Sequence, residues 1–72
     1  MIVKRSFTAV VKQDEGWWIG WIEEIPGVNS QGKTRAELKS NLRSALAEAL
    51  EFNRVDALRA AETDYEEASI VV

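Results

Sequence analysis

The chain has 72 residues and a formal charge of −3, a length that allows one small domain and not two. It contains neither cysteine nor histidine, which excludes disulfides, zinc-finger-type sites and Ser–His or Cys–His catalytic relays. No apolar run approaches the roughly 18 residues of a membrane span, and the first residues lack the apolar stretch of a signal peptide. We therefore expect a single domain over residues 1–72, located in the cytoplasm and away from membranes.

The small size predicts association with another chain. A core of this size supplies only about 3–5 kcal/mol of stability, so small domains usually need a further source. Disulfides are excluded, and no metal-binding cluster is visible in the sequence. Oligomerisation is the remaining common solution, so we expect a homodimer, a homotetramer or a complex with another protein.

The first half of the chain predicts a β-hairpin. Residues 2–12 and 17–25 are apolar runs with strand composition, and residues 13–16 between them are typical of a turn. A register with Phe7 opposite Ile22 gives the hairpin two largely apolar faces. One face carries Phe7, Ala9, Val11, Trp18, Gly20 and Ile22, and the other carries Thr8, Val10, Trp17, Ile19 and Trp21.

A short strand and a long helix are predicted next. Pro26 and Gly27 end the second strand, and residues 28–31 have room for a short third strand. Thr34 and Glu37 have the spacing of a capping box at a helix start. The residues that follow at helical spacing on one face are Leu38, Leu42, Ala45, Leu46, Ala49 and Phe52.

The last part of the chain predicts a helix end, a second short helix and a final strand. We expect the long helix to end near Asn53, a short helix over residues 55–61, and a strand over residues 68–72. The expected fold is therefore α+β, with the order β-β-β-α-β and one long helix packed on a small antiparallel sheet.

The second face of the hairpin is the candidate interface with a partner or with another copy. A single helix covers one face of a small sheet, and we place Trp18 on that covered side. The alternative is that a second helix or the tail covers the other face within the same molecule. Aromatic residues are favoured interface anchors, and the candidate residues are Thr8, Val10, Trp17, Ile19 and Trp21.

The helix start is a second candidate contact, for an anion or a partner. Lys33, Thr34 and Arg35 lie where the helix dipole is already positive, and Lys39 follows one turn later. The alternative is that these are ordinary solvated side chains.

Catalysis is not expected. Glu23 and Glu24 are adjacent on a strand and point to opposite faces, whereas Asp14 and Glu15 lie in the distant turn, so no carboxylates are forced to converge. We expect no catalytic residue, no cofactor and no metal. Direct DNA binding is not expected either, because the net charge is negative.

Several short motifs occur in the order found in HicB-like antitoxins, and the chain resembles that family over roughly residues 3–52. They are Phe7-Thr8-Ala9-Val10-Val11, Asp14-Glu15-Gly16-Trp17-Trp18, Ile25-Pro26-Gly27-Val28, Gln31-Gly32-Lys33-Thr34 and Glu37-Leu38. The resemblance implies a partial RNase H-like fold and dimers or tetramers. It also implies a partner, a small basic HicA-like toxin that cleaves mRNA and whose active site the antitoxin masks. The DNA-binding module that follows this domain in many members is not recognisable in these residues.

Three functional hypotheses follow. The leading one is an antitoxin that neutralises a small basic HicA-type toxin. The second is an orphan homo-oligomeric HicB-like module with a structural or regulatory role and no toxin partner. The third, a degenerate metal-dependent nuclease, would need convergent carboxylates that the sequence does not predict.

Overall fold

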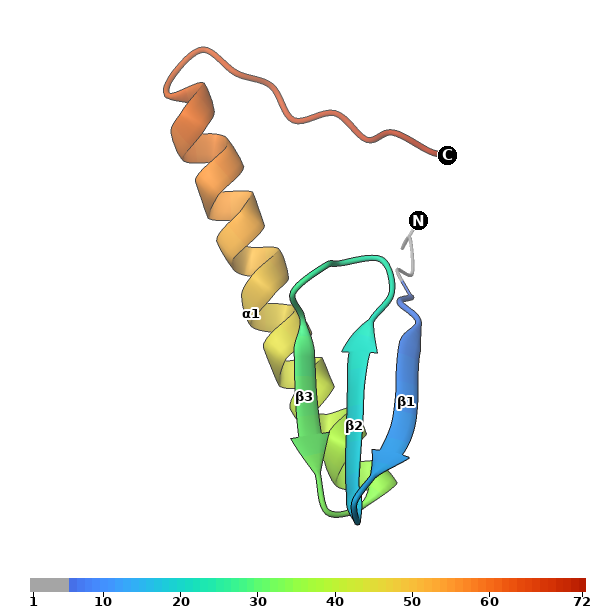
Figure 1. The fold of residues 1–72 in the computed structure, drawn as a ribbon. Coiled ribbons are helices and arrows are strands. Elements are labelled where there is room, and N and C mark those ends of the chain that lie inside the picture. Colours follow the sequence, from blue (N-terminus) through green and yellow to red (C-terminus); the bar gives the residue numbers. More distant parts are fainter. Residues whose placement is uncertain (1–5) are drawn as a thin grey trace.

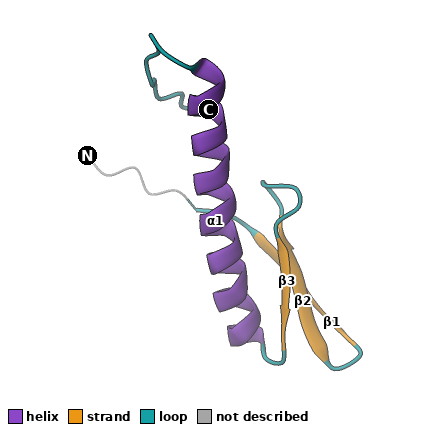
Figure 2. Cartoon of the chain, turned by 90° about the vertical axis from the view of Figure 1, so that its left-hand side faces the viewer, coloured by secondary structure: helices purple, strands orange, loops and turns teal. Residues whose placement is uncertain are grey.

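A computed structural model describes residues 6–72 as three antiparallel strands followed by one long helix (Figure 1). The strands are β1 (Ala9–Asp14), β2 (Trp17–Ile22) and β3 (Asn29–Gly32), and they lie side by side in the order β1-β2-β3. Helix α1 (Arg35–Ala61) packs on one side of this sheet (Figure 2). The expected α+β class, with a long helix on a small antiparallel sheet, is confirmed.

The hairpin between β1 and β2 closes with a turn of two residues. Glu15 and Gly16 have φ angles of 50° and 84°, and two positive angles at these positions define a type I′ turn, which suits the twist of a hairpin. The turn sets Ala9 opposite Ile22. The predicted register, with Phe7 opposite Ile22, is therefore wrong by two residues, because the turn is tighter than the predicted span of residues 13–16.

A register error of two residues leaves each side chain on the face predicted for it. Phe7, Val11 and Trp18 do pack against the core below the sheet, as expected. The strands differ from prediction mainly in their ends. β1 begins at Ala9, the predicted residues 2–5 lie outside the described part of the chain, and β2 stops at Ile22 rather than at residue 25.

Helix α1 begins as predicted and ends later. Thr34 has an extended backbone, and its hydroxyl oxygen accepts the Glu37 N–H at 3.0 Å, which confirms the cap. The predicted end near Asn53 is wrong, and the expected second helix over residues 55–61 is the continuation of α1. The sequence there contains no glycine or proline to interrupt the helix, which ends where Glu62 takes a φ of 62°.

The expected final strand over residues 68–72 is wrong for the described structure. These residues are extended but pair with no strand among residues 6–72. The additional helical turns carry the chain away from the sheet before the tail begins (Figure 1). The tail therefore starts far from any strand edge with which it could pair.

The core lies where α1 crosses β2. Ile22, Val28, Leu38 and Leu42 are the buried apolar side chains of the described residues. The helix approaches closely because Gly20 has no side chain. A Cβ atom on Gly20 would lie 2.8 Å from the Val10 carbonyl oxygen, 3.2 Å from Leu38 Cδ2 and 3.3 Å from Leu42 Cδ1.

Glu24 closes the open end of the hairpin. Its carboxylate accepts the Thr8 backbone N–H at 2.8 and 3.1 Å and the Thr8 hydroxyl at 2.8 Å. The Thr8 N–H, and then its hydroxyl, hold the pKa of Glu24 below its ordinary value of 4.5, because both contacts favour the charged form. The carboxylate thereby joins the chain before β1 to the chain after β2.

The close packing at Gly20 predicts that Gly20→Ala destabilises the fold. The added methyl group must displace either the β1 backbone or both leucines, and overpacking of this kind costs about 1–3 kcal/mol. Urea unfolding followed by tryptophan fluorescence measures the change. Ser30→Ala, directly opposite on β3, is the control and should change stability by less than about 0.5 kcal/mol. Equal stability of the two variants would contradict the packing described here.

The Glu24 contact predicts a pH dependence of stability. Because folding lowers this pKa, the contribution is present above the ordinary value of 4.5 and is lost as the pH falls through the lower folded value. Wild-type protein should therefore be more stable than Glu24→Gln at pH 7, and the difference should vanish in acid. Glu23→Gln is the control, because it removes a neighbouring charge and leaves the backbone hydrogen bond from Glu23 to Thr8 in place. A difference that stayed constant as the pH was lowered into strong acid would contradict this origin.

Candidate partner-binding surface

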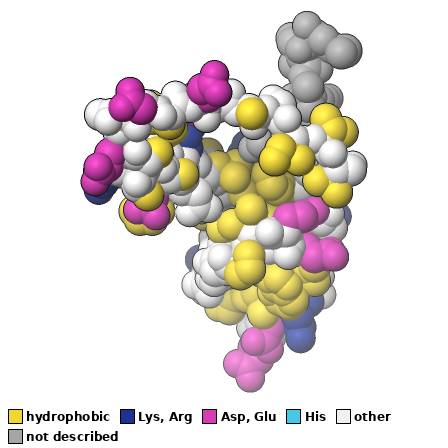
Figure 3. Space-filling model, turned by 90° about the horizontal axis from the view of Figure 1, so that it is seen from above, with side chains coloured by type: hydrophobic (Ala, Val, Ile, Leu, Met, Phe, Trp, Pro, Cys, Tyr) yellow, Lys and Arg dark blue, Asp and Glu magenta, His cyan; other side chains and the backbone are white. Residues whose placement is uncertain are grey.

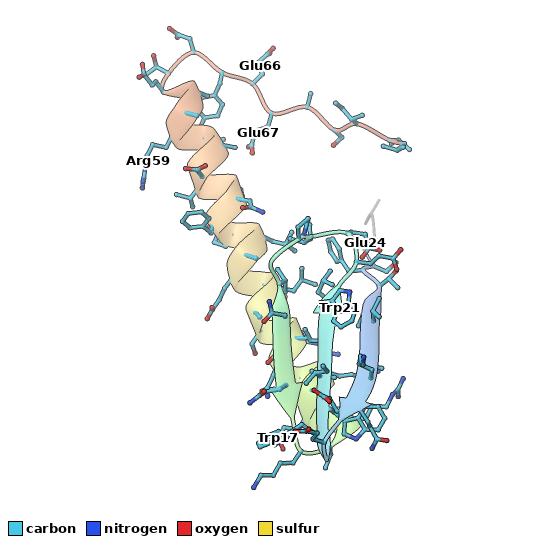
Figure 4. All side chains as sticks on the ribbon, in the orientation of Figure 1. Trp17, Trp21, Glu24, Arg59, Glu66 and Glu67 are labelled. Carbon is cyan, nitrogen blue, oxygen red and sulfur yellow. The ribbon has the colours of Figure 1, made fainter. Side chains whose placement is uncertain are left out.

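Within residues 6–72, no segment covers the face of the sheet that points away from α1. We call it the open face, and its apolar residues are Val10, Trp17, Ile19 and Trp21, with Thr8 at its margin. Trp17 and Trp21 are 41% and 42% exposed. They lie toward opposite ends of β2 (Figure 4), and Val10 pairs across the ladder with Trp21.

Among residues 6–72, nothing in the same chain covers the open face. The helix lies on the other side of the sheet (Figure 2), and the tail leaves from the far end of the helix (Figure 1). The alternative of internal covering by a second helix is removed, since residues 55–61 belong to α1. The structure thus brings together the residues predicted for the interface and leaves them accessible.

Polar residues surround the apolar centre of the open face. Lys12 lies opposite Ile19 on the β1 side, and Gln31 lies opposite Ile19 on the β3 side. Asn29 lies opposite Trp21. An apolar, aromatic centre within a polar margin is the usual composition of a protein–protein interface.

The helix start contributes structure rather than a clear binding site. Lys33, Thr34 and Arg35 are exposed, and the Thr34 hydroxyl oxygen is engaged by the cap. The predicted contact with an anion or a partner at these residues therefore stays a prediction. Among the described residues, no group of three or more Asp and Glu side chains is placed to hold a metal ion.

A groove beside β1 was not predicted from the sequence. It has a volume of about 330 Å³ and lies between β1 and the first half of α1. Its lining is apolar apart from Lys39 and Arg43, which are four residues apart on the helix. The apolar lining residues are Phe7, Ala9, Ile22, Leu42 and Leu46. The available signal was the pair of cations at a spacing of four, next to two core leucines.

The second half of α1 is also exposed. Phe52, which the sequence places on the core face, is 71% exposed because α1 extends beyond the sheet at this point. Seen from above, acidic side chains lie around the far end of the helix and the segment after it, whereas apolar side chains remain open over the sheet (Figure 3). The molecule therefore exposes apolar surface in more than one place.

Helix α1, the one helix of residues 6–72, does not combine the length and the apolar character that crossing a membrane requires.

Comparison with curated proteins finds a relative of the same length. The chain is 35% identical over 72 residues to the UPF0150 protein ssl0738 of Synechocystis sp. (strain ATCC 27184 / PCC 6803 / Kazusa). The alignment covers 97% of this chain and 99% of that protein. No family model matches the chain, and no solved structure matches it significantly.

The two sides of the sheet predict different costs for removing a tryptophan. Trp18 packs against the core, so Trp18→Ala should lower the free energy of unfolding by about 2–3 kcal/mol. Trp21→Ala removes a side chain that is 42% exposed and lies opposite Val10 and Asn29, and it should cost under about 1 kcal/mol. Urea unfolding at low protein concentration distinguishes the two. A larger loss of unfolding free energy for Trp21→Ala than for Trp18→Ala would contradict the placement of Trp18 in the core.

Proposed function

The chain belongs to the UPF0150 family, and from this premise we propose that it is a HicB-like antitoxin. It binds a small basic HicA-type toxin that cleaves mRNA, and it neutralises the toxin by masking its active site. The motifs that resemble HicB-like antitoxins lie in the hairpin and at the helix start, the part of the chain that forms the sheet and begins α1.

The observation that supports this proposal most strongly is the open face. Two tryptophans are about 40% exposed beside Val10 and Ile19, on a face of the sheet that no other part of residues 6–72 covers. Truncating a tryptophan at the centre of an interface commonly costs 2 kcal/mol or more of binding free energy. In the antitoxin role, these two tryptophans would make the main contact with the toxin.

The charge of the chain agrees with a basic partner. The formal charge is −3, and residues 56–72 contain five of the acidic residues and one basic residue. Opposite net charges speed the encounter of two proteins and suppress association with wrong partners. Because the centre of the open face is apolar, charge would act mainly on the association rate and the tryptophans on the lifetime of the complex.

In this role the protein is a binding protein, not an enzyme. It needs no cofactor and no metal, because inhibition requires only that the toxin's active site be covered. Since the toxin acts on mRNA, the complex would form in the cytoplasm. Direct binding to DNA is not part of the proposal, and neither is contact with a membrane.

A second candidate function is a homo-oligomeric module without a toxin. The open face could then be buried wholly between copies of this chain. Two further exposed apolar regions, the groove beside β1 and the far half of α1, favour self-association independently of any toxin. The two functions differ in whether a basic partner co-purifies with the chain.

The test of the antitoxin function is co-expression with the small open reading frame next to the gene. We expect a stoichiometric complex with a small basic protein, and arrested growth when that protein is expressed without the chain. The double substitution Trp17→Ser/Trp21→Ser should weaken the complex by roughly 100-fold or more. Tyr65→Ser, an equally exposed aromatic on the tail, is the control and should leave neutralisation unchanged.

The contrary results are equally specific. A neighbouring toxin that stays fully active in the presence of the chain would contradict the antitoxin function. If no partner is found and the double tryptophan variant converts an oligomer into folded monomers, the second candidate holds instead.

A further inference from the structure

The outer edge of β1 is a free sheet edge within residues 6–72. The Thr8 carbonyl accepts the Glu23 N–H at 2.9 Å. Every second residue from Thr8 onward therefore directs its backbone N–H and C=O groups toward β2. The residues between them direct their N–H and C=O groups outward, where none of the described strands lies. These residues are Ala9, Val11 and Gln13.

The opposite edge of the sheet is partly occupied. The Ile22 N–H donates to the Val28 carbonyl at 2.9 Å, so the same alternation directs the groups of Gln31 outward from β3. Asn41 of α1 donates its side-chain N–H to the Gln31 carbonyl at 2.9 Å. A strand added at β3 would find the Gln31 carbonyl already bonded to Asn41. A strand added at β1 would find outward backbone N–H and C=O groups that bond to none of the described strands.

The groove beside β1 defines what such a strand would carry. A strand added to an edge points alternate side chains to the same face, and on the helix side these side chains would enter the groove between β1 and α1. Its lining is apolar, with Lys39 and Arg43 among it. Among the described residues, neither cation takes part in an ion pair. The matching segment would have alternate apolar side chains and nearby carboxylates.

The tail of this chain has that pattern. Ile70, Val71 and Val72 are 86%, 94% and 120% exposed, and β-branched residues of this kind favour strands. The alternate residues Ala68, Ile70 and Val72 are all apolar. Glu66 and Glu67 directly precede the segment (Figure 4).

We propose that two copies of this chain associate by exchanging tails, each adding residues 68–72 as a strand to the outer edge of β1 in the other copy. The added strand bonds to the outward backbone groups of β1, the usual mode of strand addition. Ile70 and Val72 fill the groove, and Glu66 and Glu67 lie near Lys39 and Arg43. This contact uses the edge and the helix side of the sheet, so it leaves the open face free.

The shape of the chain favours pairing of β1 with the tail of a second copy over pairing with the tail of the same chain. The radius of gyration is 15.3 Å, against about 11 Å for a compact chain of this length. Helix α1 is about 40 Å long and the strands about 20 Å, so the tail starts well beyond the sheet (Figure 1). Residues 62–68 reach at most about 25 Å when fully extended, and this short segment alone would have to bring residue 68 back from the end of α1 to its own β1. A second copy requires no such return.

Solution mass tests the proposal directly. Light scattering after size exclusion should give about 16 kDa for the wild-type chain, twice its 8.1 kDa. Ile70→Glu should give a monomer with unchanged helical circular dichroism, because the substitution lies in the exposed tail. Hydrogen exchange at the Ala9, Val11 and Gln13 amides should be slow in the wild type and fast in Ile70→Glu.

A charge reversal provides a second variant that leaves the tail intact. Lys39→Glu/Arg43→Glu should weaken the dimer by roughly tenfold through repulsion of Glu66 and Glu67. Arg35→Glu/Arg59→Glu makes the same change in net charge at exposed positions of α1 that do not line the groove and should leave the dimer unchanged.

Three results would overturn the proposal. The first is a monomeric wild type with fast exchange at the three amides. The second is a monomer with slow exchange, which would mean that the tail pairs with β1 of its own chain. The third is a dimer that persists in Ile70→Glu, which would place the interface elsewhere.

Discussion

The contact between α1 and β2 at Gly20 is the constraint on which the rest of this structure depends. A side chain there would collide with the Val10 carbonyl and with both core leucines, so its absence allows Leu38 and Leu42 to lie directly on the sheet. These two leucines are half of the four buried apolar side chains among the described residues. The contact also decides which face of the sheet the helix covers.

The open face follows from that constraint. In the described part of the chain, one helix on a three-stranded sheet leaves the other side without cover, and that side carries Trp17, Ile19 and Trp21. Placing these side chains in water gains nothing for folding, whereas burying them against another protein gains binding energy. The same comparison between exposure to water and burial against another protein holds for the far half of α1 and for the tail. Their apolar residues are also exposed in a single chain. The molecule therefore has the features of a part of an assembly.

Much of this arrangement could be predicted from the sequence, and the errors have physical causes. Alternation along the hairpin identified both faces even though the register differed by two residues, because parity survives such a shift. The apolar stripe of α1 ends at Phe52, which predicts a helix end near Asn53. The helix continues because continuation depends on backbone propensity and not on the sheet below. The groove beside β1 could not be predicted, because it depends on how close the helix lies.

The central claim is that α1 covers one face of the sheet and that the open face binds the partner. Fluorine NMR of protein labelled with 5-fluorotryptophan tests it most directly, since Trp17, Trp18 and Trp21 give three separate probes. On titration with the basic protein encoded beside the gene, the Trp17 and Trp21 signals should shift and lose their sensitivity to a soluble paramagnetic agent, while the Trp18 signal stays unchanged. A complex that shifts Trp18, or leaves Trp17 and Trp21 exposed, would contradict the account.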